Sequence, residues 1–419
     1  PWMLPDEIVN TVITYSTDIG DQNPGHGWTR ANPRSAVASG FVEHDFKVNT
    51  FTTGPQEFRD TSSRNIAMDN AGNYVVVWEG DGQNNDSNGI FAQRYSANGV
   101  PQGAEMQVNT TLDGTQKNPS VSKSGNGNFV IIWQSWQQDG NGYGIVARRY
   151  DSAGVPQSGE FAVNTFTQST QDYPAVAMDN DGDFVATWSS SQQDGDWAGV
   201  YAQRYNSIGV ARGSEFQVNT YTFAHQDFSS VAMDAEGNFV VVWQSTEQEG
   251  PGSGIYAQRY DSHGTPLGGE FRVNTASSQG ERPQVSVNAQ GSFIIVWHRD
   301  GGGVFARRYS ADGTPLGSQF LVDILSDDGL HPSVAMSASG AFVVAWQAAG
   351  WDHGTSNGIY AQRYNAWGAP IGGEFLVNIE WQFEQKIPSV AMNASGAFVI
   401  VWTGNGPGDE DGVFGRRFE

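Results

Sequence analysis

The chain has 419 residues, 52 of them glycine, and no cysteine, so disulfide bonds do not hold it together. Its formal net charge is −23, with only four lysines, which argues against nucleic acid as a partner because phosphate binding needs a basic footprint. No apolar run approaches membrane-spanning length, so we expect no membrane insertion. Acidic, lysine-poor surfaces are common outside cells, and we expect an extracellular or cell-surface location.

Residues 1–44 come first and are predicted to form an N-terminal arm that is not a repeat unit. Within the arm, residues 7–15 echo a strand sequence that recurs later in the chain, so they are predicted to be a spare β-strand. A strand without a local partner can be donated to another chain, which predicts self-association into a homo-oligomer or filament. The alternatives are an arm that folds back on its own ring and a decayed extra repeat. The residues of this predicted assembly strand are Ile8, Val9, Asn10, Thr11, Val12, Ile13 and Tyr15.

Residues 45–419 are predicted to form one domain, because three sequence markers recur there seven times. The first marker is an apolar strand that ends in tryptophan, at Trp78, Trp133, Trp188, Trp243, Trp297, Trp346 and Trp402. The second is a strand of the type Ala-Gln-Arg-Tyr, with its arginine at Arg94, Arg149, Arg204, Arg259, Arg308, Arg363 and Arg417. The third is Val-Asn-Thr or a near variant, beginning at Val48, Val108, Val163, Val218, Val273, Val322 and Val377.

One unit predicts four antiparallel strands, which residues 229–275 illustrate. Strands are expected at 229–234, 239–243, 254–260 and 270–275, separated by turns rich in glycine, proline, asparagine and aspartate. Four such strands repeated radially are a β-propeller blade, so the fold class is all-β and the architecture is a seven-bladed propeller. The last unit lacks a fourth strand, and residues 45–50 are a fourth strand without a unit. We therefore expect residues 45–50 to complete the last blade and close the ring, with residues 7–14 as the alternative candidate for this strand.

The repeat unit resembles propeller repeats of long secreted or surface proteins of bacteria. The likeness rests on Ala-Met-Asp-x-x-Gly-x-Phe-Val-Val-Val-Trp, Gly-Ile-Tyr-Ala-Gln-Arg-Tyr and Gly-Glu-Phe-x-Val-Asn-Thr, and it covers about residues 45–419. It implies an adhesion, binding or structural module, and it carries no catalytic residue onto this chain.

The repeated arginine and the glutamate before the fourth strand suggest a scaffold interaction. We expect the arginine of each third strand to pair with this carboxylate, because a charge near the core edge needs a partner. The glutamates are Glu160, Glu215, Glu270 and Glu374.

The loops between second and third strands vary most between units, and such loops on a rigid scaffold are where binding residues concentrate. They contain extra tryptophans beside aspartate and glutamine, a combination that suits stacking and hydrogen bonding to sugars. Packing within the protein and contact with another protein are the alternatives. The candidate ligand-binding residues are Trp136, Asp139, Asp194, Trp197 and Trp351, with Trp381 in a neighbouring entry loop.

One turn has the alternating oxygen ligands of a calcium loop, at Asp179, Asp181 and Asp183. The equivalent turns of other units lose the carboxylates but keep the glycine, so the feature that the units share is a tight turn. Ca²⁺ is the one cofactor that the sequence suggests. The seven histidines are scattered without metal-ligand spacing, and no Gly-x-Ser-x-Gly motif occurs.

These patterns predict a structural or adhesive propeller without enzymatic activity, assembling through its arm. The first alternative is a lectin-like propeller that binds carbohydrate on one loop face. The second is a polysaccharide hydrolase or lyase with its site at the central channel.

Overall fold

The computed structural model describes residues 44–59, 64–81, 88–275, 279–299, 302–325, 328–349, 357–379, 384–406 and 409–419. All regular elements in these ranges are strands, and they contain no helix long and apolar enough to cross a membrane. The predicted arm falls outside the described ranges except for His44, so its spare strand stays a prediction.

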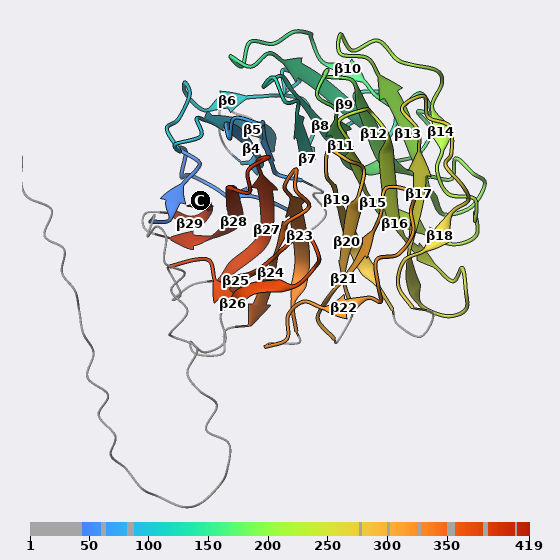
Figure 1. Cartoon of the computed structure of the whole chain (residues 1–419). Coiled ribbons are helices and arrows are strands. Elements are labelled where there is room, and N and C mark those ends of the chain that lie inside the picture. The colour runs from blue at the N-terminus through green and yellow to red at the C-terminus, as the bar shows by residue number, and fades with distance from the viewer. Residues whose placement is uncertain are drawn as a thin grey trace, which may run out of the picture. The chain divides into compact units, whose positions relative to one another are not determined.

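Seven antiparallel sheets form a seven-bladed β-propeller, as the sequence predicts (Figure 1). In each sheet the first strand is innermost and the fourth is outermost. The first strands of blades 1 to 7 are β3 (Ile66–Met68), β7 (Gln116–Lys123), β11 (Gln171–Met178), β15 (Gln226–Met233), β19 (Glu281–Val287), β23 (Leu330–Met336) and β27 (Gln385–Met392). The second strands are β4 (Tyr74–Gly80), β8 (Phe129–Trp136), β12 (Phe184–Ser191), β16 (Phe239–Thr246), β20 (Phe293–His298), β24 (Phe342–Ala349) and β28 (Phe398–Gly406).

The third strands match the second strands in length in six blades, whereas most fourth strands have only two residues. The third strands are β5 (Gly89–Tyr95), β9 (Tyr143–Tyr150), β13 (Ala198–Tyr205), β17 (Ser253–Tyr260), β21 (Val304–Tyr309), β25 (Asn357–Tyr364) and β29 (Asp409–Phe418). The fourth strands are β6 (Met106–Gln107), β10 (Phe161–Ala162), β14 (Phe216–Gln217), β18 (Phe271–Arg272), β22 (Phe320–Leu321), β26 (Pro370–Leu376) and β1 (Phe46–Lys47). Blade 1 has one further strand, β2 (Gln56–Glu57), which pairs with β4 beside β3.

The N-terminal strand closes the ring, which confirms the predicted role of residues 45–50. Phe46 pairs with Gly415 and Lys47 pairs with Phe414, so β1 is the fourth strand of blade 7. Asn49 strengthens this join, because its amide nitrogen donates to Asp409 at 2.8 Å and its amide oxygen accepts the Val413 N–H at 2.8 Å. The two ends of the ring are therefore held by hydrogen bonds rather than by a connecting turn.

The core lies between the blades. The second strands are apolar on both faces because each blade is covered by a neighbour on either side. Trp243 of blade 4, for example, is fully buried and packs with Val185 and Ala202 of blade 3. An equivalent cluster joins blade 7 to blade 1, where Trp78 packs with Val401 and Val413. The repeated tryptophans are thus the main inter-blade packing groups.

Candidate functional site

One end of the blades carries the variable loops, and we call it the loop face. It consists of the connections between second and third strands and the segments that enter the first strands. In blade 3, Gln171 pairs with Ser190 at this end, and Ala198 bridges to His225 of blade 4. The predicted residues Trp136, Asp139, Asp194 and Trp197 all lie on this face, on blades 2 and 3.

Trp197 is the most exposed of the predicted aromatic residues. Its side chain is 65% exposed, and its ring lies 5.4 Å from that of His225 on blade 4. Phe223, in the same entry segment as His225, is 59% exposed. The Asp196 carboxylate accepts the Ala224 N–H at 3.0 Å, which ties the two loops together. Blades 3 and 4 therefore present an aromatic surface on a braced support.

Trp136 is partly committed to packing. It ends β8 with 40% of its side chain exposed, and its ring meets that of Tyr143 edge-on at 4.8 Å. The Lys117 ammonium lies 4.0 Å from the centre of the Tyr143 ring. Blade 2 thus offers a second, smaller aromatic surface with a cation beside it.

The two predicted aspartates hold their own loops in place. The Asp139 carboxylate accepts the side-chain N–H of Asn164 at 2.9 Å, and Asp194 accepts that of Gln217 at 3.2 Å. Asp194 also accepts the Asp196 N–H at 3.3 Å. Both carboxylates therefore support the surface on which Trp136 and Trp197 stand. Trp351 and Trp381 lie outside the described residues.

The predicted calcium loop lies at the other end of blade 3, in the turn between its first and second strands. One Asp179 oxygen accepts the N–H groups of Asp181 and Asp183, both at 2.9 Å. Asp183 accepts the Ser207 N–H at 2.7 Å and forms an ion pair with Arg212 at 2.8 Å. Asp234 makes the same two backbone contacts in blade 4, so this geometry belongs to the turn. Within the described residues, no group of three or more acidic or histidine side chains is placed to hold a metal ion.

The predicted pairing of repeat arginines with glutamates is wrong. The Arg149 guanidinium instead donates to the backbone carbonyls of Ile208 at 2.7 Å and Ser207 at 2.5 Å, in the third-to-fourth-strand turn of the next blade. Glu215 reaches back one blade and accepts the N–H of Thr165 at 2.6 Å. Each charge is satisfied by backbone groups across the blade interface, which the spacing within one unit could not reveal.

A second group of residues, which the sequence analysis missed, lines the loop-face end of the first strands. We call it the channel mouth; it comprises Asp172, Tyr173, Asp227, Phe228, Glu281, Arg282, His298 and His331. Tyr173 and Phe228 stack with ring centres 4.5 Å apart, and the Arg282 guanidinium lies 5.1 Å from the Phe228 ring. All three occupy the same repeat position in successive blades, with φ of 54°, 51° and 50°. The equivalent residues Asn118, His331 and Ile387 have φ of 53°, 50° and 54°, so the positive φ belongs to a β-bulge that six blades share and turns these side chains out of the regular strand alternation.

Two carboxyls of the channel mouth, Asp172 and Asp227, have pKa values raised toward neutral pH. Burial raises the pKa of Asp172 to about 6, against the opposing effects of Lys117 and Gln134. Burial raises the pKa of Asp227 to about 7, and Glu281 and Asp172 add to this while Arg282 opposes it. Adjacent blades therefore present two electrostatically coupled carboxyls.

His298 is neutral at physiological pH. Burial lowers its pKa to about 4, and the nearby His331 and Arg282 contribute. The 3.6 Å contact between His298 and Glu281 is thus not an ion pair at pH 7. The signal that could have identified the mouth is the variation at one repeat position, which reads Lys117, Asp172, Asp227, Glu281 and Lys386 within an otherwise regular motif.

No known protein-family profile and no curated protein matches this chain. A protein of unknown function from Dyadobacter fermentans is similar in structure, with 11% identity, coverage of 89% of this chain and 96% of that one, and a TM-score of 0.54. The phage phi92 endosialidase is 7% identical over 89% of this chain and 68% of its own, with a TM-score of 0.51. The β-propeller domain of the Trilobed protease from Pyrococcus furiosus is 8% identical over 88% and 96%, also with a TM-score of 0.51. At these identities the likeness is one of fold.

Proposed function

We propose that this protein is an adhesive binding propeller that holds an extended glycan on the loop face of blades 2 to 4. The observation that carries the proposal is the exposed Trp197, braced beside Phe223 and His225 on the same face as the channel mouth. Sugar rings stack their C–H faces on aromatic side chains, and their hydroxyls bind carboxylates and guanidinium groups. Asp172, Asp227 and Arg282 supply such polar groups at the mouth.

Charge and location fit this proposal. A net charge of −23 disfavours polyanionic ligands, so a neutral or cationic glycan is the better match. An acidic, lysine-poor surface suits the extracellular or cell-surface location proposed here. If the arm joins several propellers, the assembly would carry several binding sites, and linked sites raise the overall affinity for a glycan.

The test is a glycan array followed by calorimetry on the glycans that bind. Trp197→Ala should weaken binding at least tenfold, which corresponds to about 1.4 kcal/mol. Trp367→Ala is the matched control, because Trp367 is 81% exposed and lies in a turn at the opposite end of blade 6. Equal affinities for the two variants, or an array without any bound glycan, would refute the proposal.

A glycan-active enzyme is a second candidate, favoured by the coupled carboxyls. One protonated and one ionised carboxyl is the arrangement that acid–base hydrolysis of a glycosidic bond requires, and Asp172 and Asp227 have pKa values of about 6 and 7. Incubation with bound glycans and mass analysis of the products would detect turnover. An enzyme should lose turnover but keep binding in Asp227→Asn, whereas a binding protein shows no products with either form.

A further inference from the structure

The Oδ1 atom of Asp227 is buried and has no hydrogen-bond donor among the described residues. The residue as a whole keeps a partly exposed edge at the channel mouth. The equivalent Asp172 of blade 3 differs, because its carboxylate accepts the side-chain N–H of Gln134. Removing a carboxyl from water without giving it a donor costs free energy. Asp227 therefore indicates a place where a ligand supplies the missing partner.

The groups around this carboxyl make the site acidic. Asp172 in the preceding blade and Glu281 in the next blade both raise the pKa of Asp227, and Arg282 is the basic group that opposes them. The paired strand β16 places the uncharged Gln244 opposite Asp227. Two further acids against one base leave a negative environment, which attracts a cation and repels an anion.

The basic side chains of this region are engaged with aromatic rings. The Arg282 guanidinium lies 5.1 Å from the centre of the Phe228 ring, and the Lys117 ammonium lies 4.0 Å from that of Tyr143. His298 carries no charge at pH 7, because burial lowers its pKa to about 4. The Asp227 carboxylate therefore stays available to a cation that comes from outside the protein.

A ligand reaches the mouth from the loop face, because a side chain obstructs the channel beneath it. Arg64 of blade 1 donates to the Val285 carbonyl of blade 5 at 3.2 Å. Since these blades are not neighbours in the ring, the Arg64 side chain spans the central channel. Val285 lies further from the loop face than Glu281, with which β19 begins. A glycan on the loop face can thus present a side group to Asp227 without threading the ring.

We propose that the channel mouth binds the ammonium group of an amino sugar, with Asp227 as the residue that selects it. This inference rests on the proposed glycan-binding function and narrows the ligand to a glycan with free amino groups. The Tyr173 and Phe228 rings, 4.5 Å apart, add faces that attract a cation. Trp197 contacts His225, two residues before Asp227, so its exposed ring is placed to stack on a neighbouring sugar. The net charge of −23 favours the same ligand at longer range.

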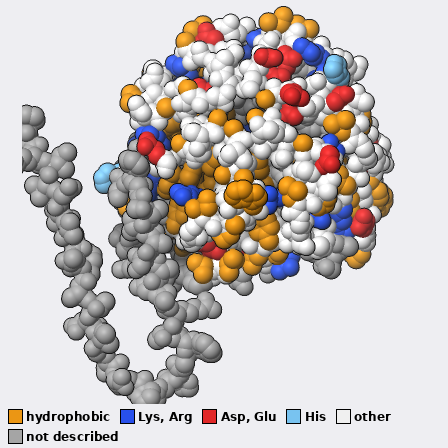
Figure 2. Space-filling model, viewed as in Figure 1, with side chains coloured by type: hydrophobic (Ala, Val, Ile, Leu, Met, Phe, Trp, Pro, Cys, Tyr) orange, Lys and Arg blue, Asp and Glu red, His pale blue; other side chains and the backbone are white. Residues whose placement is uncertain are grey.

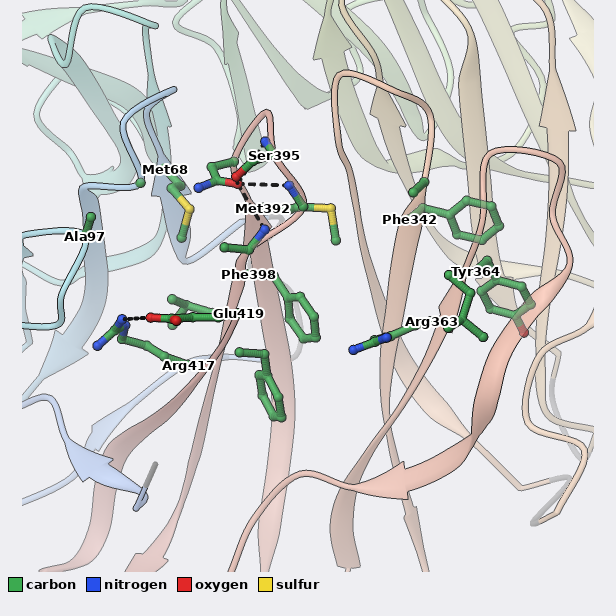
Figure 3. Close-up of a pocket in the computed structure, with 18 of the residues that line it drawn as sticks. Met68, Ala97, Phe342, Arg363, Tyr364, Met392, Ser395, Phe398, Arg417 and Glu419 are labelled. Atoms are coloured by element: carbon green, nitrogen blue, oxygen red, sulfur yellow. Dashed lines mark hydrogen bonds and ion pairs between the residues drawn. The ribbon is translucent and has the colours of Figure 1, made fainter. Parts of the chain in front are cut away.

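The hollow at the opposite end of the ring has different chemistry. It measures about 550 Å³, lies between blades 6, 7 and 1, and has a largely apolar lining that includes Met392 and Phe398 (Figure 3). Figure 2 shows apolar side chains gathered over the part of the ring where Figure 1 places β24 to β28. Its basic residues, Arg363 and Arg417, outnumber its one acid, Glu419. We therefore expect the ammonium group at the mouth and not in this hollow.

Calorimetry with a matched pair of oligosaccharides tests the selection. A hexamer of glucosamine and a hexamer of N-acetylglucosamine share one backbone and differ in the charge of the amino groups. At pH 6, where glucosamine is protonated, the protein should bind the first at least about tenfold more tightly. Asp227→Asn should remove this preference, and Asp227→Glu should keep part of it. Asp181→Asn, which removes one charge from an exposed turn of blade 3, is the matched control and should keep all of it.

Proton release gives a second readout. With a pKa of about 7, Asp227 is mostly protonated at pH 6 in the free protein, and an adjacent ammonium group favours its ionised form. Binding of the glucosamine hexamer should therefore release protons, which calorimetry in buffers of different ionisation enthalpy measures. The acetylated hexamer should release none, and neither hexamer should release any from Asp227→Asn.

The outcomes separate this inference from the proposed function on which it rests. Equal affinity for the two hexamers, or a preference that survives in Asp227→Asn, would overturn the inference and leave glycan binding in place. The same holds if the array binds other glycans and the glucosamine hexamer does not bind. An array without any bound glycan would overturn both. Thermal unfolding of each variant verifies that it is folded before its affinity is compared.

Discussion

The Asp227 carboxyl shows how the ring changes the chemistry of one side chain. Burial raises its pKa to about 7, whereas an unfolded chain releases this proton near pH 4. Between these values the folded state holds more protons than the unfolded state. The group therefore lowers stability progressively as the pH rises from about 4 to about 7.

We expect Asp227→Asn to stabilise the protein at pH 7.5 and to change little at pH 4. A shift of about three pKa units corresponds to about 4 kcal/mol, but the asparagine amide also loses solvation at this buried position, so we expect a net gain of about 1–2 kcal/mol. Thermal unfolding at the two pH values measures the effect. Asp181→Asn, an exposed acid at the other end of blade 3, is the control. A variant no more stable than the parent at pH 7.5 would contradict the raised pKa.

At the scale of elements, charged side chains join the blades through the backbone. A repeat arginine such as Arg149 donates to two carbonyls of a turn in the next blade, and a carboxylate at the start of a fourth strand, such as that of Glu215, accepts the N–H of the last residue of the Val-Asn-Thr segment in the preceding blade. Both contacts cross an interface that is otherwise apolar. Each blade is thus fixed to its neighbours near both ends of its outer strands.

The loss of one of these arginine contacts between blades should be measurable. We expect Arg149→Ala to cost about 1–2 kcal/mol of unfolding free energy, because two charge-assisted hydrogen bonds disappear. Arg149→Lys should recover little, since an ammonium cannot reproduce the planar fork that meets both carbonyls. Arg212→Ala is the control; its 2.8 Å ion pair with Asp183 is half-exposed and should contribute close to nothing. Full recovery by Arg149→Lys would show that charge alone matters.

The repeat period predicted the elements because each marker corresponds to a strand with a fixed environment. Residues 229–234 and 239–243 were expected as strands, and the structure has β15 at Gln226–Met233 and β16 at Phe239–Thr246. The fourth strand at 270–275 is only Phe271–Arg272, because Asn274 leaves the ladder and its side chain accepts the Ile255 N–H at 2.9 Å. Sequence pattern finds an element more reliably than its ends.

The site could be predicted only in part. The exposed loop tryptophans stand out because they interrupt a repeat. The channel mouth assembles side chains from three or more blades at equivalent positions, such as Tyr173, Phe228 and Arg282. Their proximity depends on how successive blades pack side by side, which the pattern within one unit does not encode. The same reason explains the wrong arginine partners, since the true ones lie in the next blade.

For the whole molecule, stability depends on a join without a connecting turn. In blades 1 to 6 the fourth strand follows the third in the chain, so detaching it also disturbs the turn. In blade 7, β1 and β29 come from distant parts of the sequence. Detachment of β1 would expose Trp78 and its cluster without unfolding β29. Each partial opening of this kind has its own free energy, which can be measured by amide hydrogen exchange.

Seven equivalent amides allow this idea to be tested inside one protein. The N–H of the valine in each Val-Asn-Thr segment donates to a third-strand carbonyl; these are Val48, Val108, Val163, Val218, Val273, Val322 and Val377, at 2.7 or 2.8 Å. Because the bond lengths match, differences in exchange rate report the ease of opening rather than the bond itself. We expect Val48 to exchange fastest, with Val218 among the slow ones. Equal protection at all seven would mean that the seam is as strong as a continuous blade, and that the ring opens only when the whole propeller unfolds.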